Sequence, residues 1–425
     1  MTDIKIPNPL IINGKYLTKY FEHFDCIFKK KKDSRVLLAF SGGSDSILLL
    51  YLLLRYFKGN KRVINIAHIN HNLRNDSFKD EAFVTKVGLE LEINTYIRQL
   101  NPKLKSNDES TESWARKERY KLLSEILIES NSNFILTGHH KNDQAETILK
   151  NISEKTGLFG LGGMKSVNKN LIRPLLPFTK LELMRIIDKY KIPYVDDSLN
   201  GELRFKRNFI RKKVLGPWVL DDNKVVDSIA ESGANFSEYQ QSLIYFINEF
   251  IQKNVSELQN GQFLIKKKHI KELPILARVM VFQVLTNSLR QFRKCDFQSI
   301  KNFIQKNIIG SLYTSRFGWC LLEDRKYYIL SKESRAKKNK TIDLTIGKAA
   351  NFLEYDYICR ETNSKFEKSE NPNVEYIDQH KIKNKKLQLR VWKKGDAFRP
   401  LGMSGKQKIS DFLTNKKLNR FEKFN

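Results

Sequence analysis

The stretch from residue 36 to residue 57 constrains the fold more than any other part of this 425-residue chain. An apolar run, VLLAF, meets a polar turn, and the apolar run ILLLYLLL follows at once. The first run has the length of a buried strand (36–40), and the second, to residue 57, that of a helix starting at residue 47. The turn consists of Ser41, Gly42, Gly43, Ser44, Asp45 and Ser46. Its two glycines let the backbone approach a bound anion closely, so the order strand, turn, helix predicts an α/β domain with an anion site.

The alternation of strand and helix continues to about residue 155. Further strands are expected at 63–69, 93–100 and 134–137, and further helices at 78–91, 110–130 and 142–154. Short strands that alternate with helices predict a doubly wound parallel sheet with right-handed crossovers. Ligands of such sheets bind outside the carboxyl ends of the strands. We therefore predict a nucleotide-binding catalytic domain over residues 1–218.

The pattern changes after Pro217. Long helices are expected at 223–255, 273–292 and 295–307, a hairpin at 311–330, and a strand at 386–392. The predicted architecture continues with a mainly helical middle domain (219–335), a charged linker (332–340) and a small α+β terminal domain (341–425).

The composition of the chain narrows the range of molecules that it is expected to bind. The chain has 76 basic and 47 acidic residues, a net charge of +29, which favours nucleic acid or an anionic membrane surface. A lysine-rich codon bias is an alternative cause. The longest apolar run, 47–54, is too short to span a bilayer, and the N-terminus has no signal-peptide pattern. Four scattered cysteines without a CxxC pair indicate reduced thiols in a cytoplasmic protein.

The turn has the chemistry of a phosphate loop. Backbone N–H groups at the positive end of a helix point at a bound anion, and Ser44 and Ser46 add hydroxyl donors. Asp45 can hold Mg²⁺ or orient the loop. No Gly-x-x-x-x-Gly-Lys-Ser/Thr element occurs, so the turn is not an ordinary P-loop. The alternative is a glycine turn with a polar helix cap.

Two further strand ends carry polar residues. Ala67 and His68 end the second strand, and Gly138 ends the fourth, before a helix with His139, Asp143 and Glu146 on one face. The two carboxylates can bind Mg²⁺, or hold an ammonium group and help it lose a proton. A zinc site and an ordinary acidic helix start are the alternatives, and the histidines of the second strand can simply cap it.

Two basic segments follow the same logic. Arg116 and Arg119 lie three residues apart on one helix face, where a guanidinium suits the charge of an α-phosphate. The run 204–213, with Arg207, Arg211 and Lys212, interleaves basic and aromatic residues that can hold RNA phosphates and stack on bases. A solvated charged face and an amphipathic helix are the respective alternatives. The glycine-rich stretch 156–163 is a lid or a connection.

The motif SGGSDS resembles the loop of the N-type ATP pyrophosphatases, which have an adenine nucleotide α hydrolase-like fold. Within them the chain resembles the tRNA(Ile)-lysidine synthetases, from about residue 17 to the end. The matching segments are 67–74, 115–120, 137–147, 207–211 and 394–402.

This resemblance implies ATP and Mg²⁺ as cofactors, and cleavage between the α- and β-phosphates. ATP would bind at 41–46, Ala67, His68 and Gly138, with Arg116 on the α-phosphate and Asp45 on the metal. Asp143 and Glu146 would place and deprotonate free lysine, which replaces AMP on C2 of the wobble cytidine of a CAU-anticodon tRNA(Ile) and so changes its codon and amino-acid specificity.

The resemblance also implies RNA contacts by Arg207, Arg211 and Lys212, and a homodimer is one option for assembly. Two departures stand out. Asn142 occupies a position where the family commonly has an acidic residue, and the chain stops early, at 420–425, so we expect the terminal domain to lack closing strands. Rival readings are a tRNA thiolase of the same superfamily, a catalytically inactive tRNA-binding protein and a small-molecule amidating ligase.

Overall fold

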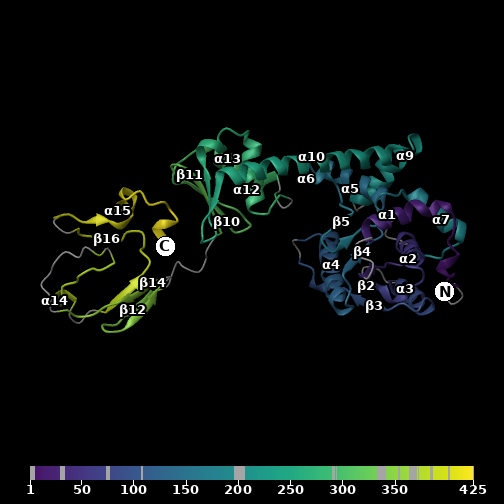
Figure 1. Cartoon of the computed structure of the whole chain (residues 1–425), viewed down its shortest axis with the longest axis horizontal. Coiled ribbons are helices and arrows are strands. Elements are labelled where there is room, and N and C mark those ends of the chain that lie inside the picture. Colours follow the sequence, from purple (N-terminus) through teal and green to yellow (C-terminus); the bar gives the residue numbers. More distant parts are fainter. Residues whose placement is uncertain are drawn as a thin grey trace. The chain divides into compact units, whose positions relative to one another are not determined.

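The chain divides into two compact units, Met1–Leu243 and Ile244–Asn425 (Figure 1). The computed structural model describes residues 5–28, 34–72, 77–106, 109–195, 206–289, 292, 294–332, 341–352, 355–362, 371, 373–382, 386–400 and 403–424. Most of the expected linker and the start of the basic run at 204–205 lie outside these ranges. The boundary between the units falls within one long helix, α10 (Val225–Asn254). The division into three domains stays a prediction.

The first unit contains the predicted doubly wound sheet. Its strands are β1 (Val36–Ala39), β2 (Ile64–Asn70), β3 (Thr95–Gln99), β4 (Phe134–Leu136), β5 (Val167–Asn168) and β6 (Leu171–Ile172). They lie in the order β3-β2-β1-β4-β6-β5. All neighbours are parallel except β5 and β6, a short hairpin that the sequence pattern did not predict.

Helices cover both faces of this sheet (Figure 1). In chain order, the helical elements up to α10 are α1 (Thr18–Phe28), α2 (Ser44–Tyr56), α3 (Ser77–Glu90), α4 (Thr111–Glu129), α5 (Lys141–Ser153), α6 (Leu158–Leu161) and α7 (Lys180–Tyr190), then α8 (Lys206–Phe209), a π-helical turn (Ile210–Leu215), α9 (Gly216–Asp221) and α10. The stretch 156–163, expected to be a lid or a connection, thus contains the short helix α6.

Helix α2 begins three residues earlier than predicted. Gly43 is its N-cap, so Ser44, Asp45 and Ser46 form the first helical turn. Every residue from Ser46 to Leu54 is buried, against β1 on one side and α1 and α7 on the other. Each fully buried leucine contributes about 1.5–3 kcal/mol. This packing fixes the first turn of α2 relative to the sheet edge.

The direction of winding reverses between β1 and β4, where the helices α2 and α5 leave the sheet. At such a switch point the two connections diverge, and a crevice opens outside the carboxyl ends of the strands. The loops that follow β1 and β4 therefore face each other.

The second unit contains a five-stranded antiparallel sheet in the order β7-β8-β11-β10-β9. The elements are β7 (Val255–Glu257), β8 (Phe263–Lys266), α11 (Lys267–Ile270), α12 (Ile275–Leu285), α13 (Lys294–Lys306), β9 (Leu312–Thr314), β10 (Trp319–Glu323) and β11 (Tyr327–Lys332). The expected hairpin belongs to this sheet. The helix expected at 273–292 ends earlier, at Leu285, because Asn287 takes a left-handed conformation with a φ of 52°.

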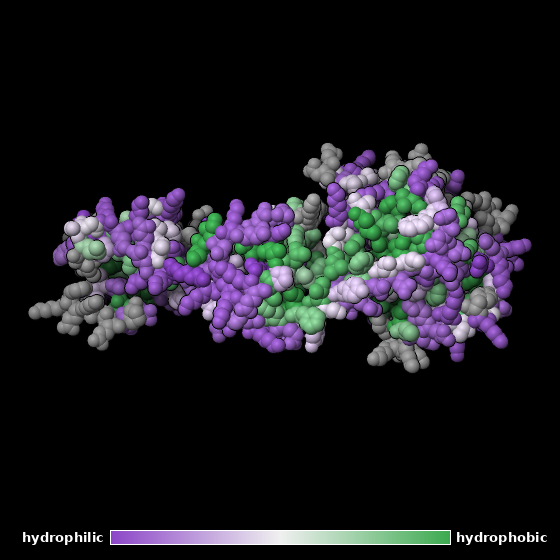
Figure 2. Space-filling view, turned by 90° about the horizontal axis from the view of Figure 1, so that it is seen from above, coloured by the Kyte–Doolittle hydropathy of each residue, from purple (hydrophilic) through white to green (hydrophobic). Residues whose placement is uncertain are grey.

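The remaining residues form small antiparallel pairs of strands, β12 with β15, β13 with β14 and β16 with β17. Their elements are β12 (Thr341–Leu344), β13 (Ala349–Phe352), β14 (Tyr355–Ile358), α14 (Gln379–Ile382), β15 (Leu387–Arg390), β16 (Ala397–Phe398), β17 (Gln407–Lys408) and α15 (Ile409–Asn415). Hydrophilic residues cover much of the face shown in Figure 2, with hydrophobic residues between them. Within the described part of the chain, no helix combines the length and hydropathy needed to span a membrane.

Candidate active site

The glycine turn is held in shape by its own polar groups. Gly42 has a φ of +81°, and a Cβ atom there would lie 3.1 Å from a ring carbon of Phe83. The Ser46 hydroxyl donates to the carbonyl of Gly43 (2.9 Å), and the Gly43 N–H donates to Ser41 Oγ (3.3 Å). The turn is therefore preformed in the way that a backbone anion site requires.

Asp45 joins the turn to two other helices. Its Oδ1 atom lies 2.7 Å from Nζ of Lys180, the first residue of α7, and its Oδ2 atom lies 3.6 Å from Nε2 of His140, the N-cap of α5. Burial alone would raise the pKa of Asp45, but contact with His140 and the charge of Lys180 lower it below its usual value. Asp45 is thus held as a carboxylate.

Gly138 lets β4 approach this turn closely. A Cβ atom at Gly138 would lie 3.1 Å from the carbonyl carbon and oxygen of Asp45, and 3.3 Å from its Cβ. Backbone atoms cannot yield as a flexible side chain can. Gly138 therefore leaves room for the first turn of α2, and its contact with ATP stays a prediction.

Replacing Gly138 by alanine should displace the first turn of α2. Overpacking of this kind costs about 1–3 kcal/mol, and ATP affinity should fall about tenfold or more. Gly405→Ala is the control, because a Cβ atom at Gly405 meets nothing within 4 Å. Isothermal titration with ATP and thermal unfolding check both effects. A Gly138→Ala protein with wild-type affinity and stability would contradict the tight fit.

The structure brings Asp143 and Glu146 together at the start of α5. Asp143 and His140 form a capping box, in which the His140 N–H donates to Asp143 Oδ2 (2.9 Å) and the Asp143 N–H donates to His140 Nδ1 (3.4 Å). The Asp143 side chain is 10% exposed and that of Glu146 only 1%. Carboxylates this deeply buried need cationic partners.

Two arginines supply those partners. Arg207 donates from Nη2 to Asp143 Oδ1 (2.5 Å) and from Nε to Glu146 Oε2 (2.8 Å). Arg211 donates from Nε to Glu146 Oε1 (2.5 Å) and also reaches Asp143 Oδ1 (3.4 Å). The predicted lysine-binding and RNA-binding residues thus form one cluster, which the sequence pattern did not suggest. Lys212, the third predicted RNA contact, is exposed.

The charges in this cluster stabilise one another. Burial alone would raise the pKa of Asp143, but His140 and Arg207 hold it well below its usual value. Burial alone would lower the pKa of Arg207, but Asp143 and Glu146 raise it. Removing one member of a buried pair typically costs about 3–5 kcal/mol, because the other charge is left unpaired.

His139 lies beside this cluster, and its Nδ1 atom is 2.8 Å from the Thr137 hydroxyl. Burial lowers the pKa of His139 to about 3; Asp143 opposes this shift, while Arg207 and Arg173 add to it. The imidazole is therefore neutral in the folded protein at neutral pH.

This shift predicts a pH dependence of stability. Unfolded His139 takes a proton near pH 6.5 and the folded residue only near pH 3, so stability present above pH 6.5 is lost as the pH falls towards 3. His139→Gln removes this proton linkage, and its urea midpoint should fall less than that of the wild type between pH 7 and pH 5. Equal falls in the two proteins would show that His139 titrates normally.

Two further arginines, Arg116 and Arg173, interact with Tyr120 on α4. The guanidinium of Arg116, the predicted catalytic arginine, stands 5.2 Å from the ring centre of Tyr120, and the residue is exposed. Arg173, just after β6, is buried, and no described residue accepts a hydrogen bond from its Nε. Burial lowers the pKa of Arg173, Tyr120 opposes this, and Arg116 adds to it. Arg173 is a site candidate that the sequence analysis missed.

Ala67 and His68, predicted to contact ATP at the end of the second strand, lie within β2, which continues to Asn70. Ala67 and His68 are both buried, and the Ala67 carbonyl accepts from the N–H of Phe40, the residue before the turn (2.8 Å). His68 Nδ1 lies 3.0 Å from the carbonyl oxygen of Phe40, and burial lowers the pKa of His68. His68 therefore fastens β2 to the strand that leads into the turn.

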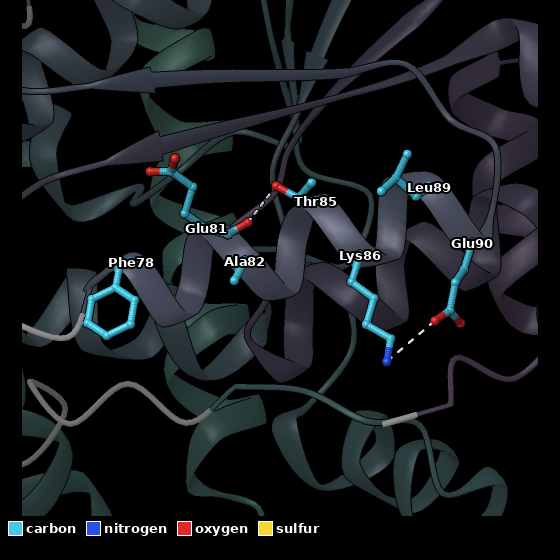
Figure 3. Close-up of a pocket in the computed structure, with 7 residues that line it drawn as sticks. All are labelled: Phe78, Glu81, Ala82, Thr85, Lys86, Leu89 and Glu90. Atoms are coloured by element: carbon cyan, nitrogen blue, oxygen red, sulfur yellow. Dashed lines mark hydrogen bonds and ion pairs between the residues drawn. The ribbon is translucent and has the colours of Figure 1, made fainter. Parts of the chain in front are cut away.

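No described residues form a group of three or more His, Cys, Asp and Glu that could hold a metal ion. A groove on α3 is lined by residues with no predicted role, among them Phe78 and Leu89, beside the ion pair Lys86–Glu90 (3.5 Å; Figure 3).

The sheet and its preformed turn define the class of protein. The family model of the PP-loop domain matches residues 17–217, so the first unit contains a PP-loop domain.

Comparison with whole proteins narrows the class to a family. A tRNA(Ile)-lysidine synthase of Caldanaerobacter subterraneus is 30% identical, over 92% of this chain and 86% of that protein. One of Clostridium perfringens is 28% identical, over 92% and 88%. One of Thermosipho africanus is 38% identical, and there the match covers 48% of each chain. The chain belongs to the tRNA(Ile)-lysidine synthase family.

Proposed function

We propose that this chain is an ATP-dependent ligase that joins lysine to C2 of the wobble cytidine of a CAU-anticodon tRNA(Ile). The observation that carries the proposal is the buried pair Asp143 and Glu146. The pair lies close to the PP-loop, because His140 contacts both Asp143 and the PP-loop residue Asp45. An enzyme that ligates an amine needs a site for an ammonium group beside its nucleotide site, and this arrangement offers both.

In the first step, the cytidine O2 atom attacks the α-phosphorus of ATP, and pyrophosphate leaves with the electron pair of the broken P–O bond. The PP-loop binds the phosphates, and the exposed Arg116 side chain stabilises charge on the α-phosphate. Mg²⁺ fits this site through one carboxylate, that of Asp45, together with the nucleotide's phosphates. When bound, Mg²⁺ neutralises phosphate charge.

In the second step, the acidic pair Asp143 and Glu146 takes a proton from the ε-ammonium group of lysine, the resulting amine attacks C2, and AMP leaves with the electron pair of the broken C2–O bond. Asp143 suits the placing of an ammonium group, because its lowered pKa keeps it ionised. While Arg207 holds it, Asp143 is too weak a base to take a proton from the lysine ammonium group. Because Arg207 helps to lower that pKa, removal of its guanidinium from the cluster raises the basicity of Asp143.

The tRNA site is proposed for the segment 206–221. Lys212 and Lys213 are exposed and can bind backbone phosphates, and Phe209 (48% exposed) and Trp218 (46%) offer rings for stacking on unpaired bases. The terminal domain would add salt-dependent affinity elsewhere on the tRNA. A thiolase is less well supported, because Cys26 is the only one of the four cysteines that lies in the first unit.

The assignment is tested by incubation with ATP, labelled lysine and a CAU-anticodon tRNA. Lysine should enter the RNA, and AMP and pyrophosphate should be released. Asp143→Asn keeps an oxygen for the helix cap but loses the charge, so lysine incorporation should fall about 100-fold, while pyrophosphate release continues. Glu154→Gln is the control, since Glu154 caps the far end of α5 and pairs with the exposed Lys206.

Two outcomes would contradict the proposal. Pyrophosphate release by the wild type without lysine incorporation would rule out the lysidine reaction and favour another ATP-using activity. Wild-type incorporation by Asp143→Asn would show that this carboxylate does not place lysine. Circular dichroism confirms that the variant is folded.

The arginine pairs imply an order of binding. Arg207 and Arg211 are the cations that now occupy both carboxylates, so we infer that tRNA phosphates draw them from the cluster and open it to lysine. Lysine affinity, measured by isothermal titration, should therefore rise when tRNA is present. Arg211→Gln should bind lysine at least about threefold more tightly without tRNA, because one competing cation is gone.

Lys206→Gln is the matched control for this experiment. It removes one positive charge from the same segment, but Lys206 pairs with Glu154 (3.7 Å) rather than with the cluster. Its lysine affinity without tRNA should equal that of the wild type. If lysine affinity is the same with and without tRNA in all three proteins, the inferred exchange of the arginines for lysine is wrong.

A further inference from the structure

The PP-loop has no lysine of its own, but a lysine from another helix reaches it. After the two glycines the turn continues with Ser44, Asp45 and Ser46, where a P-loop has lysine followed by serine or threonine. The ammonium group of Lys180 lies 2.7 Å from Ser44 Oγ and 2.7 Å from Asp45 Oδ1. A cation separated from the turn by more than a hundred residues thus stands at the first turn of α2.

The backbone of Lys180 is fixed with respect to α5. Thr179 and Glu182 form a capping box at the start of α7, and the N–H of Lys180 donates to Asn142 Oδ1 (2.9 Å). The N–H of Lys141 in turn donates to the carbonyl of Phe178 (2.8 Å). The starts of α5 and α7 are thus joined, and the Lys180 side chain extends from this joint to α2.

The contact with Asp45 lies at the rim of the site. The side chain of Lys180 is 34% exposed and that of Asp45 is 30% exposed, so the pair can exchange partners without opening a core. Asp45 by itself would repel a phosphate at the start of α2. A triphosphate offers an ammonium group several anionic acceptors, and charge-assisted hydrogen bonds to them are strong.

We propose that Lys180 is the phosphate-binding lysine of this site and donates to the β- and γ-phosphates, the part of ATP that leaves as pyrophosphate. It supplies positive charge to the leaving group while the bond between the α-phosphorus and the bridging oxygen breaks, and no proton is transferred. Asp45, freed from Lys180, is then available to the metal. This proposal rests on ATP being the substrate, as proposed above.

The test compares ligands that share or lack the terminal phosphates. In Lys180→Met, affinity for ATP and for pyrophosphate should fall about 10- to 100-fold, and affinity for AMP should stay within about twofold. Lys180→Arg, which keeps the charge, should recover part of the loss. The matched control is Lys141→Met, because Lys141 is likewise the first residue of a helix but pairs with Asp227 (2.5 Å).

A second comparison separates phosphate binding from mere neutralisation of Asp45. Asp45→Asn and the double variant Asp45→Asn/Lys180→Met both lack that carboxylate. If Lys180 binds phosphate, the double variant should bind pyrophosphate about tenfold more weakly than Asp45→Asn. Equal affinities would show that Lys180 only neutralises Asp45, and would overturn the proposal.

Other outcomes are equally decisive. Wild-type ATP affinity in Lys180→Met would overturn the proposal. An equal loss of affinity for AMP and ATP would also overturn it, because Lys180 would then only shape the turn. These titrations need neither tRNA nor lysine. A wild-type protein that binds ATP but makes no lysidine would therefore refute the lysidine reaction alone, and one that binds neither ATP nor pyrophosphate would refute both proposals.

Discussion

The carboxylate of Asp45 is the contact on which the geometry of the PP-loop domain depends. Because β1, β4 and β6 are parallel neighbours, the helices α2, α5 and α7 all begin near one edge of the sheet. Each start carries positive dipole charge, and an acidic side chain there is worth about 0.3–1 kcal/mol per helix end. Asp45 lies in the first turn of α2 and reaches His140 of α5 and Lys180 of α7. Asp45 therefore supplies a negative charge that the N-termini of the three helices share.

The acidic pair follows the same principle with the signs reversed. Asp143 and Glu146 form an anionic site, and the cationic side chains of Arg207 and Arg211 occupy it. In both proposed ligand sites, a side chain of the protein thus has the same sign of charge as the proposed ligand. Asp45 is negative like a phosphate, and the two arginines are positive like the lysine ammonium group. Breaking a buried pair and leaving one charge alone is costly, whereas exchanging one partner for another of like charge keeps both satisfied. Substrates that arrive with the right charges can therefore replace the internal partners at modest cost.

The sequence was sufficient for features that depend on local pattern. Strand, turn and helix at the PP-loop follow from hydropathy and glycine. Lys180 and Arg173 were missed because their roles depend on β6 lying beside β4, which no local pattern reveals. One signal was present, since Thr179 and Glu182 have capping-box spacing before an apolar run and mark the start of α7.

The basic run around Arg207 shows the limit more sharply. Arginines among aromatic residues predict RNA contacts, and exposed Lys212 is compatible with that reading. No local pattern predicts that the two arginines turn inwards, because the carboxylates that attract them lie about sixty residues earlier, on α5. Pairing between distant elements is a property of the fold, and a basic segment has the same pattern whether its charges face solvent or a buried acid.

Asn142 shows how a departure from a family pattern can be accommodated. Its side-chain oxygen accepts the hydrogen bond from the N–H of Lys180, a task that needs an acceptor but no charge. A carboxylate could accept the same bond, but it would add a third negative charge beside Asp143 at the start of α5. The charges of Arg207 and Arg211 already match those of Asp143 and Glu146 one for one. A neutral amide at 142 therefore keeps the joint between α5 and α7 and leaves the charge balance of the cluster complete, so the proposed chemistry has no need of a third acid there.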